Sequence, residues 1–153
     1  MTSNINDFEI KQRQKWMATL SRSSCQELED AWQEISEKPD YHYLRKPEIG
    51  SIMVRGRVGG RGVQFNLGEI TVTRCTLKTS KGIVGVSYII GRNTRRAELV
   101  ALFDAILQDP LYYKDVSNTI ISRLKASYDK KKAEISKEAS TTKVDFFTMV
   151  RGE

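Results

Sequence analysis

The sequence predicts an α+β fold, with a mostly antiparallel sheet of four to five strands and helices packed mainly on one face. Apolar residues recur at helical spacing in the first 35 residues and again after residue 94. Between these segments, residues 41–90 contain alternating and β-branched runs joined by short links. Consecutive strands with short links favour antiparallel pairing. The expected order is α-α-β-β-β-β-α-α, followed by an extended tail.

The composition indicates one domain, residues 1–153, with an affinity for anions. A length of 153 residues fits a single domain. Within it we expect a flexible N-terminal stretch at residues 1–5 and an apolar tail at residues 143–153. The net charge of +6 favours nucleotides, phosphorylated substrates, nucleic acid or an acidic protein face as partners. The charge alone does not choose among them.

The cysteines and the histidine exclude several kinds of site. Cys25 and Cys75 form neither a disulfide framework nor a zinc spacing, and His42 is the only histidine. We therefore expect no metal site, and free thiols in a reducing cytoplasm. We see no signal peptide and no apolar run of about 18 residues, so we expect a cytoplasmic protein without a membrane segment.

Two helices are predicted before the sheet. The first runs from Asn6 or Asp7 to about Leu20. Ser24 and Glu27 form the sequence of a capping box, which marks the start of the second helix. The residues after it recur at the spacing of a buried helical stripe: Leu28, Ala31, Trp32 and Ile35.

The predicted strands follow Pro39. Residues 41–45 form the first, and Pro47 restricts it to a sheet edge or ends it early. Residues 52–57 and 69–77 alternate with strand periodicity on either side of a glycine-rich loop. The run from Ile83 to Ile90 is apolar on both faces apart from Ser87, which makes it the best candidate for a central strand.

Two more helices are predicted after the sheet. Asn93 or Thr94 caps the first, which spans about Arg95 to Gln108 and is apolar nearly all round, as a buried helix is. Arginines at its start, including Arg92, oppose the helix dipole. They are either solvated or paired with an anion or a partner carboxylate. Ser117 is the expected cap of the last helix.

The C-terminal tail is unusually apolar for a chain end. Chain ends are usually polar and loose, whereas this one carries large apolar side chains that must be covered. Either the tail pairs as a strand with its own sheet, or it docks on another chain. The candidate interface residues are Phe146, Phe147, Met149, Val150 and Arg151.

The stretch from Ser51 to Lys78 is the candidate functional segment, because it encloses a glycine-dense basic loop. Glycine lets backbone N–H groups turn toward an anion, and arginine adds a planar donor that fits phosphate oxygens. The alternative is an ordinary basic hairpin that needs glycine for its turn. The loop lacks the Gly-Lys-Ser/Thr of a P-loop, and Phe65 stands where the third glycine of a dinucleotide fingerprint would be.

Several motifs resemble those of PhnG, the G subunit of the bacterial carbon–phosphorus lyase core complex. The resemblance covers about residues 10 to 152 and departs from the pattern nowhere within the motifs. Its residues are Arg13-Gln14-x-Trp16-Met17; Gly59-Gly60-Arg61-Gly62-x-x-Phe65-x-x-Gly68-Glu69-x-Thr71-x-Thr73-Arg74; Gly85-x-Ser87-Tyr88-x-x-Gly91-Arg92; Ala97-Glu98; Asp104-Ala105; and Val144 to Gly152.

The resemblance implies membership of a complex with the H, I and J subunits, acting in alkylphosphonate catabolism. The G, H and I subunits, with the L subunit, are implied to replace the adenine of ATP with methylphosphonate at the ribose 1′ carbon. This is the reaction of an alpha-D-ribose 1-methylphosphonate 5-triphosphate synthase, a multi-subunit transferase. The J subunit then cleaves the carbon–phosphorus bond with an iron–sulfur cluster and S-adenosylmethionine.

The residues limit what this chain contributes to that chemistry. A cluster needs a set of cysteine ligands, which Cys25 and Cys75 cannot supply. No nucleophile–base pair stands out, so we expect no catalytic residue, no cofactor bound by this chain alone and a structural and binding role. The candidate residues for binding an anion or the substrate are Arg55, Arg57, Gly59, Gly60, Arg61, Arg74 and Arg92.

Two other functions are compatible with the composition. A stand-alone basic module could bind nucleic acid, but it lacks the interleaved aromatic residues of single-strand binders. A small enzyme could act alone on a phosphorylated metabolite, but the missing acid–base pair argues against it. We therefore expect an obligate subunit with large, fairly apolar interfaces and no nucleic-acid partner.

Overall fold

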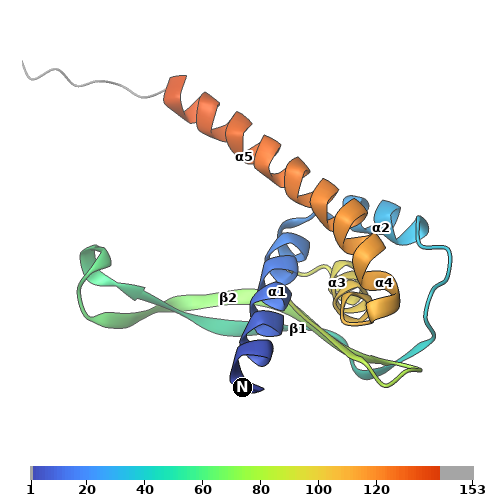
Figure 1. The fold of residues 1–153 in the computed structure, drawn as a ribbon. Coiled ribbons are helices and arrows are strands. Elements are labelled where there is room, and N and C mark those ends of the chain that lie inside the picture. Colours follow the sequence, from blue (N-terminus) through green and yellow to red (C-terminus); the bar gives the residue numbers. More distant parts are fainter. Residues whose placement is uncertain (1, 142–153) are drawn as a thin grey trace, which may run out of the picture.

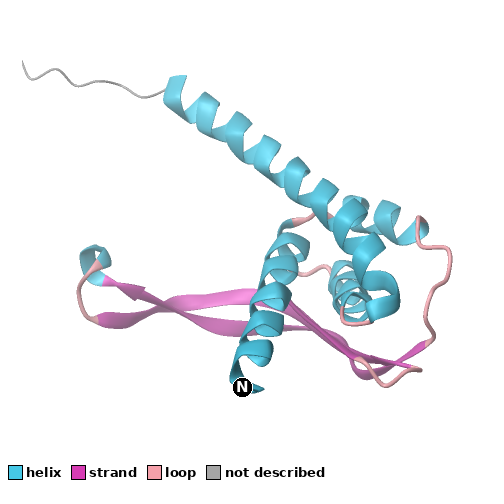
Figure 2. Cartoon of the chain, viewed as in Figure 1, coloured by secondary structure: helices cyan, strands magenta, loops and turns pink. Residues whose placement is uncertain are grey.

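A computed structural model describes residues 2–141, with the backbone alone for residues 2–8 (Figures 1 and 2). Two helices precede a three-stranded sheet, and a helical segment follows it. The main elements are α1 (Thr2–Arg22), α2 (Cys25–Gln33), β1 (Tyr41–Arg57), β2 (Gln64–Thr79), β3 (Val84–Ile90), α3 (Thr94–Leu107), α4 (Pro110–Val116) and α5 (Ser122–Thr141). A short 3-10 helix, Val58–Gly60, joins β1 to β2, and a π-helical turn, Ser117–Ile121, joins α4 to α5.

The predicted sheet of four to five strands is wrong, because the described chain forms one antiparallel sheet of three strands in the order β1-β2-β3. The two strands expected at residues 41–45 and 52–57 are one continuous strand that passes through Pro47. Proline is tolerated there because β1 lies at the sheet edge. Between Arg45 and Glu48 the pairing also shifts, since three steps along β1 match two along β2.

The central strand is β2, and β3, the expected central strand, lies at an edge. The two faces of β3 have different neighbours. Gly85, Ser87 and Ile89 are buried, whereas Tyr88 and Ile90 are exposed. The apolar character of both faces of β3 therefore does not reflect burial between two layers.

Helix α3 forms the centre of the core, as its sequence predicts. Every residue from Ala97 to Leu107 is buried, and the helix packs on β2 and β3. The contact with β3 is close, because a Cβ built on Gly85 would stand 2.0 Å from the carbonyl oxygen of Ala101. Helices α1 and α2 pack on α3 in turn, which places the helices near one end of the sheet (Figure 1).

The predicted capping box is confirmed at the start of α2. Ser24 Oγ accepts the Glu27 N–H at 3.2 Å, and the Glu27 carboxylate accepts the Ser24 N–H at 2.9 Å. Glu27 also accepts from Lys131 at 2.8 Å and from Ser127 at 2.6 Å, both on α5. Lys131 and then Ser127 lower the pKa of Glu27 to about 2, although burial opposes the shift. Glu27 therefore ties α5 to α2.

The last helical segment begins earlier than its sequence suggests. Asp109 Oδ1 caps it by accepting the Leu111 N–H at 3.0 Å, and Pro110 occupies the first helical position. Ser117, the expected cap, has helical φ and ψ angles and lies inside the continuous helix. Helix α5 then extends away from the body (Figure 1). The tail residues 143–153, including the interface candidates Phe146, Phe147, Met149, Val150 and Arg151, lie outside the described residues.

Candidate functional site

The candidate site lies on a projecting hairpin, called here the arm (residues 51–71). It begins where β3 ends, because Ile90 pairs with Val72, the first residue of β2 beyond the arm. No residue of the arm is buried. Its side-chain hydrogen bonds stay inside it, from Ser51 to Glu69 and from Arg57 to the Gly62 carbonyl. In Figure 2 the arm extends away from the helices as a two-stranded ribbon.

The glycines at the arm's tip are required by the turn itself. Gly59 and Gly60 have φ angles of 57° and 79°, which favour glycine. Gly62 donates its N–H to the Val58 carbonyl at 2.8 Å, and a Cβ on Gly62 would stand 2.6 Å from that oxygen. The turn therefore explains Gly59, Gly60 and Gly62 without an anion.

The arm carries three of the predicted arginines together. Arg55 and Arg57 lie two residues apart on β1, which places them on one face, and Arg61 follows at the tip. All three are exposed. No acidic residue occurs between positions 51 and 68. The arm therefore presents a basic surface whose one acidic residue, Glu69, lies opposite Met53 and accepts a hydrogen bond from Ser51.

The other two predicted arginines lie elsewhere. Arg74 donates to Glu48 at 2.6 Å on the adjacent strand, and the Tyr88 hydroxyl and Glu48 raise its pKa. Arg92 is exposed and follows Gly91, whose N–H bonds the Thr71 carbonyl. From that level the strand runs seven residues to Gln64, or about 23 Å at about 3.3 Å per residue. The seven candidates therefore do not converge on one site.

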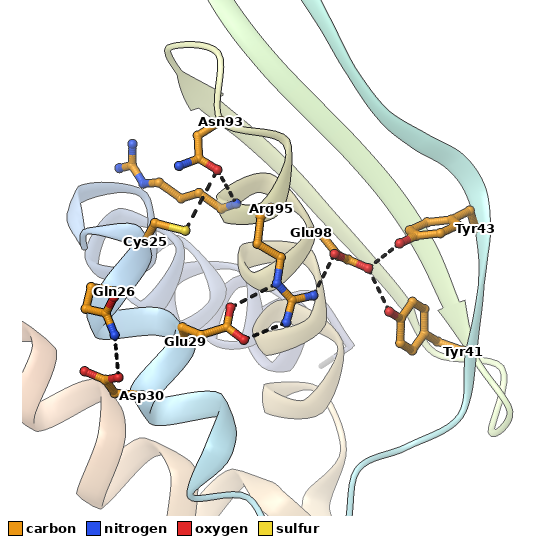
Figure 3. Close-up of polar contacts among 10 residues, drawn as sticks. Cys25, Gln26, Glu29, Asp30, Tyr41, Tyr43, Asn93, Arg95 and Glu98 are labelled. Carbon is orange, nitrogen blue, oxygen red and sulfur yellow. Dashed lines mark hydrogen bonds and ion pairs between the residues drawn. The ribbon is translucent and has the colours of Figure 1, made fainter.

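A second polar cluster joins β1, α2 and α3 (Figure 3). Glu98 accepts hydrogen bonds from Tyr41 at 2.7 Å and from Tyr43 through one oxygen, and from Arg95 at 2.8 Å through the other. Arg95 also forms a two-pronged ion pair with Glu29, at 2.9 Å for each bond. The sequence interpretation left open a partner carboxylate for the arginines at this helix start. For Arg95 the carboxylates come from the same chain.

The electrostatics of this cluster match a structural clamp. Burial opposes ionisation of Glu98, yet the hydrogen bonds from Tyr43, Arg95 and Tyr41 lower its pKa. Burial and the neighbouring Glu98 carboxylate raise the pKa of Tyr43, and Glu29 raises that of Arg95. All groups therefore keep the protonation states in which they bind one another. Sequence analysis missed the tyrosines, although their spacing of two, on one strand face, was a usable signal.

Another polar cluster, which is buried, surrounds Asp104 of α3. Its carboxylate accepts from Arg13 at 3.1 and 2.6 Å, from Trp16 Nε1 at 3.0 Å and from the Val86 N–H at 3.0 Å. Arg13 and Trp16 also line an open cleft of about 580 Å³ between α1 and the junction of α3 and α4. Both oxygens of Asp104 are occupied by partners within the chain, so this carboxylate joins α1, α3 and β3.

Metal-ligating side chains do not cluster among the described residues, and the Cys75 thiol is buried. Among the side chains from residue 9 to residue 141, no group of three or more His, Cys, Asp or Glu could hold a metal ion. Cys75 is buried, and burial raises its pKa to about 11, which keeps it a poorly nucleophilic thiol. Within the part of the chain that the structure describes, no helix is long and apolar enough to cross a membrane.

Comparisons with known proteins agree with the sequence motifs. A family model described as "Phosphonate metabolism protein PhnG" matches residues 11–152. A relative from Rhizobium meliloti (strain 1021) is 44% identical over 151 residues, which cover 97% of this chain and 94% of the relative. That relative is described as "Alpha-D-ribose 1-methylphosphonate 5-triphosphate synthase subunit PhnG".

Proposed function

The chain belongs to the PhnG family of phosphonate metabolism proteins, and on that basis we propose that it is a subunit of an alpha-D-ribose 1-methylphosphonate 5-triphosphate synthase. The observation that carries the proposal is the 44% identity across 97% of the chain. The other subunits of that synthase are its partners. We propose that they are the H, I and J subunits, with the L subunit acting alongside, in the cytoplasm.

The proposed reaction places a bond between a phosphonate oxygen and the ribose C1′ of ATP. The bond from C1′ to adenine breaks, adenine leaves with the bonding electrons and takes up a proton, and the 5′-triphosphate is retained. We propose that this chain supplies no catalytic residue, because its clusters at Glu98 and Asp104 are occupied by internal partners. ATP is then a substrate of the assembly rather than a cofactor of this chain.

Within the assembly, we propose that the arginines of the arm contact the anionic substrate. Both ATP and methylphosphonate carry phosphate-like oxygens, which suit the planar donors of Arg55, Arg57 and Arg61. These side chains are exposed, and the one acidic residue of the arm, Glu69, accepts a hydrogen bond from Ser51. Arg74 is bound to Glu48 and is a weaker candidate.

Co-expression with the partner subunits tests the proposal. The tagged chain should elute as a particle of fixed stoichiometry, which releases adenine from ATP only when methylphosphonate is present. Omitting the chain should abolish that release. A chain that elutes alone and folded, or adenine release that does not need it, would contradict the proposal.

The arginine role is tested in the same preparation with Arg55→Ala combined with Arg57→Ala. Because a charge-assisted hydrogen bond contributes about 1.5–3 kcal/mol, we expect an assembled complex whose KM for ATP or methylphosphonate rises roughly ten-fold or more. Arg123→Ala is the control, since Arg123 lies on α5 in an exposed ion pair with Glu34. An intact complex with unchanged KM values would show that the arm arginines do not bind substrate.

A further inference from the structure

One face of the arm is apolar, and this character continues onto the rest of the sheet. Strand alternation places Ile52, Val54 and Gly56 on one face of β1. The Phe65 ring lies 3.6 Å from where a Cβ on Gly56 would stand, and Ile70 pairs with Ile52, so both share that face. We call the whole surface the apolar strip; its residues are Ile52, Val54, Phe65, Leu67, Ile70, Val72, Tyr88 and Ile90.

The apolar strip faces away from α3. Along β2, Thr73, Cys75 and Leu77 alternate with Val72 and are buried on the side of the helix. Ile90 pairs directly with Val72 and therefore joins the opposite face. Most side chains of the strip are exposed, with Phe65 at 43%, Leu67 at 66%, Tyr88 at 54% and Ile90 at 71%, whereas Val72, where the strip reaches the body, is 3% exposed.

The length of the strip distinguishes it from scattered surface residues. From Phe65 to Val72 it follows seven residues of β2, or about 23 Å at about 3.3 Å per residue. Monomeric proteins rarely expose a contiguous apolar patch larger than a few hundred Å². The length and apolar character of the strip are therefore typical of a surface that another chain covers.

The charges point to a different chain rather than a second copy. The chain carries a net charge of +6, so two copies would bring like charges together, whereas an acidic partner is attracted. Edge-to-edge pairing of two β1 strands is also disfavoured, because Pro47 and a register shift interrupt that edge. Strand alternation places Arg55 and Arg57 on the opposite face of the arm, where they stay uncovered when the strip is buried.

We propose that the apolar strip docks on a different subunit of the same assembly, one of net negative charge with an apolar surface of its own. Docking in this way leaves the arginine face of the arm uncovered, so that Arg55 and Arg57 stay free to meet an anionic substrate. The inference rests on the proposed function, because it takes the partner from that assembly. The inference adds that the apolar strip makes the contact, and it distinguishes this surface from the arginine residues that are proposed to contact substrate.

The test is co-expression of the tagged full-length chain with the other subunits. Leu67→Asp combined with Ile90→Asp places two charges on the strip. The matched control is Ile135→Asp on α5, because Ile135 and Leu67 are both 66% exposed aliphatic side chains. We expect the strip variant to remain folded and monomeric, with an unchanged far-UV circular dichroism spectrum, and to recover at least ten-fold less of the acidic subunit. The control should recover as much as the wild type.

A photo-crosslinker in place of Leu67 supplies a positive readout that does not depend on a loss. It should crosslink to an acidic subunit of the co-expressed set, whereas the same group at position 135 should not. Recovery of the acidic subunit by the strip variant, equal loss in the Ile135 control, or a Leu67 crosslink to a second copy or to nucleic acid would overturn the inference. If the wild-type chain recovers no subunit at all, the proposed function fails as well, which separates the two failures.

Discussion

Asp104 explains, at the residue scale, why motifs far apart in the sequence belong to one structure. Arg13 and Trp16 come from the motif near the start of the chain, and Asp104 comes from a motif about 90 positions later. In the fold both side chains donate to the Asp104 carboxylate, which is fully buried. These motif residues therefore serve the architecture, because they join α1 to α3.

We predict that Asp104→Asn strongly destabilises the chain. Each carboxylate oxygen accepts from at least two donors, so the amide nitrogen of asparagine would face Arg13 and Trp16 on one side, or Arg13 and the Val86 N–H on the other. Removing the charge and leaving a buried donor unpaired should lower the free energy of unfolding by about 2–4 kcal/mol. Urea denaturation of the purified variant measures this loss.

Asp115→Asn is the control for that measurement, because Asp115 is exposed on α4. It should change the free energy of unfolding by no more than about 0.5 kcal/mol. A similarly small change for Asp104→Asn would mean that the carboxylate is not the structural centre described above.

Local sequence rules worked at residues whose contacts are close in the sequence. The capping box at Ser24 follows from spacing alone, and Asn93, one of the two caps expected for α3, accepts the Arg96 N–H at 2.9 Å. The partners of Arg95 could not be read in this way, because Glu29 lies 66 positions away on another helix. Residue spacing along the sequence does not show which carboxylate from a distant part of the chain will lie beside Arg95 in the fold.

At the scale of elements, Gly85 sets how closely α3 approaches the sheet. A Cβ at this position would stand 2.0 Å from the Ala101 carbonyl oxygen and 2.9 Å from the Ala105 side chain. Neither the helix backbone nor a buried alanine can move away without shifting the whole element. Glycine is therefore required by the packing of a helix against a strand and not by a turn.

We predict that Gly85→Ala destabilises the fold by about 2 kcal/mol or more, since overpacking a close-packed core typically costs about 1–3 kcal/mol. Gly50→Ala is the control. Gly50 is also a strand glycine, has no atom within 4 Å of the position of an added Cβ and has no positive φ angle. Thermal unfolding should show a lower Tm for Gly85→Ala alone; equal Tm values would contradict the proposed close contact.

The number of strands was the part of the secondary structure that the sequence did not predict correctly. The helices around the sheet followed from apolar periodicity, and burial of α3 was predicted correctly. For Pro47 the sequence analysis offered two alternatives, a sheet edge or an early end of the strand. The predicted strand count assumed an early end, whereas β1 continues through Pro47 at the sheet edge. Only pairing with β2 decides between them, since the register shift beside Pro47 lets β1 continue in the same ladder, where a further shift follows between Val54 and Arg55.

At the scale of the whole molecule, the chain divides into a packed body and an unsupported arm. The body holds all the buried residues among positions 9–141, whereas none lies between residues 51 and 71. The sequence predicted the hairpin and its basic residues. It could not predict that the hairpin would project, because projection depends on β3 ending at Ile90, opposite Val72.

We predict that this division appears within a single strand by amide hydrogen exchange. A two-stranded ribbon is only marginally stable in water, so the amides of residues 64–71 should open locally. The amides of residues 72–79 lie between β1 and β3 beneath α3 and should open only with the body. Exchange in the first set should be at least about 100-fold faster in the isolated chain, which corresponds to about 2.7 kcal/mol.

The same measurement on the assembled complex connects stability to function. If the apolar strip is covered by another subunit, residues 64–71 should become nearly as protected as residues 72–79, while protection of the body changes little. The second half of β2 serves as the internal control, because both sets belong to one strand. Uniform protection along β2 in the isolated chain would show that the arm is stable alone, and an arm that stays unprotected in the complex would leave its apolar strip facing solvent.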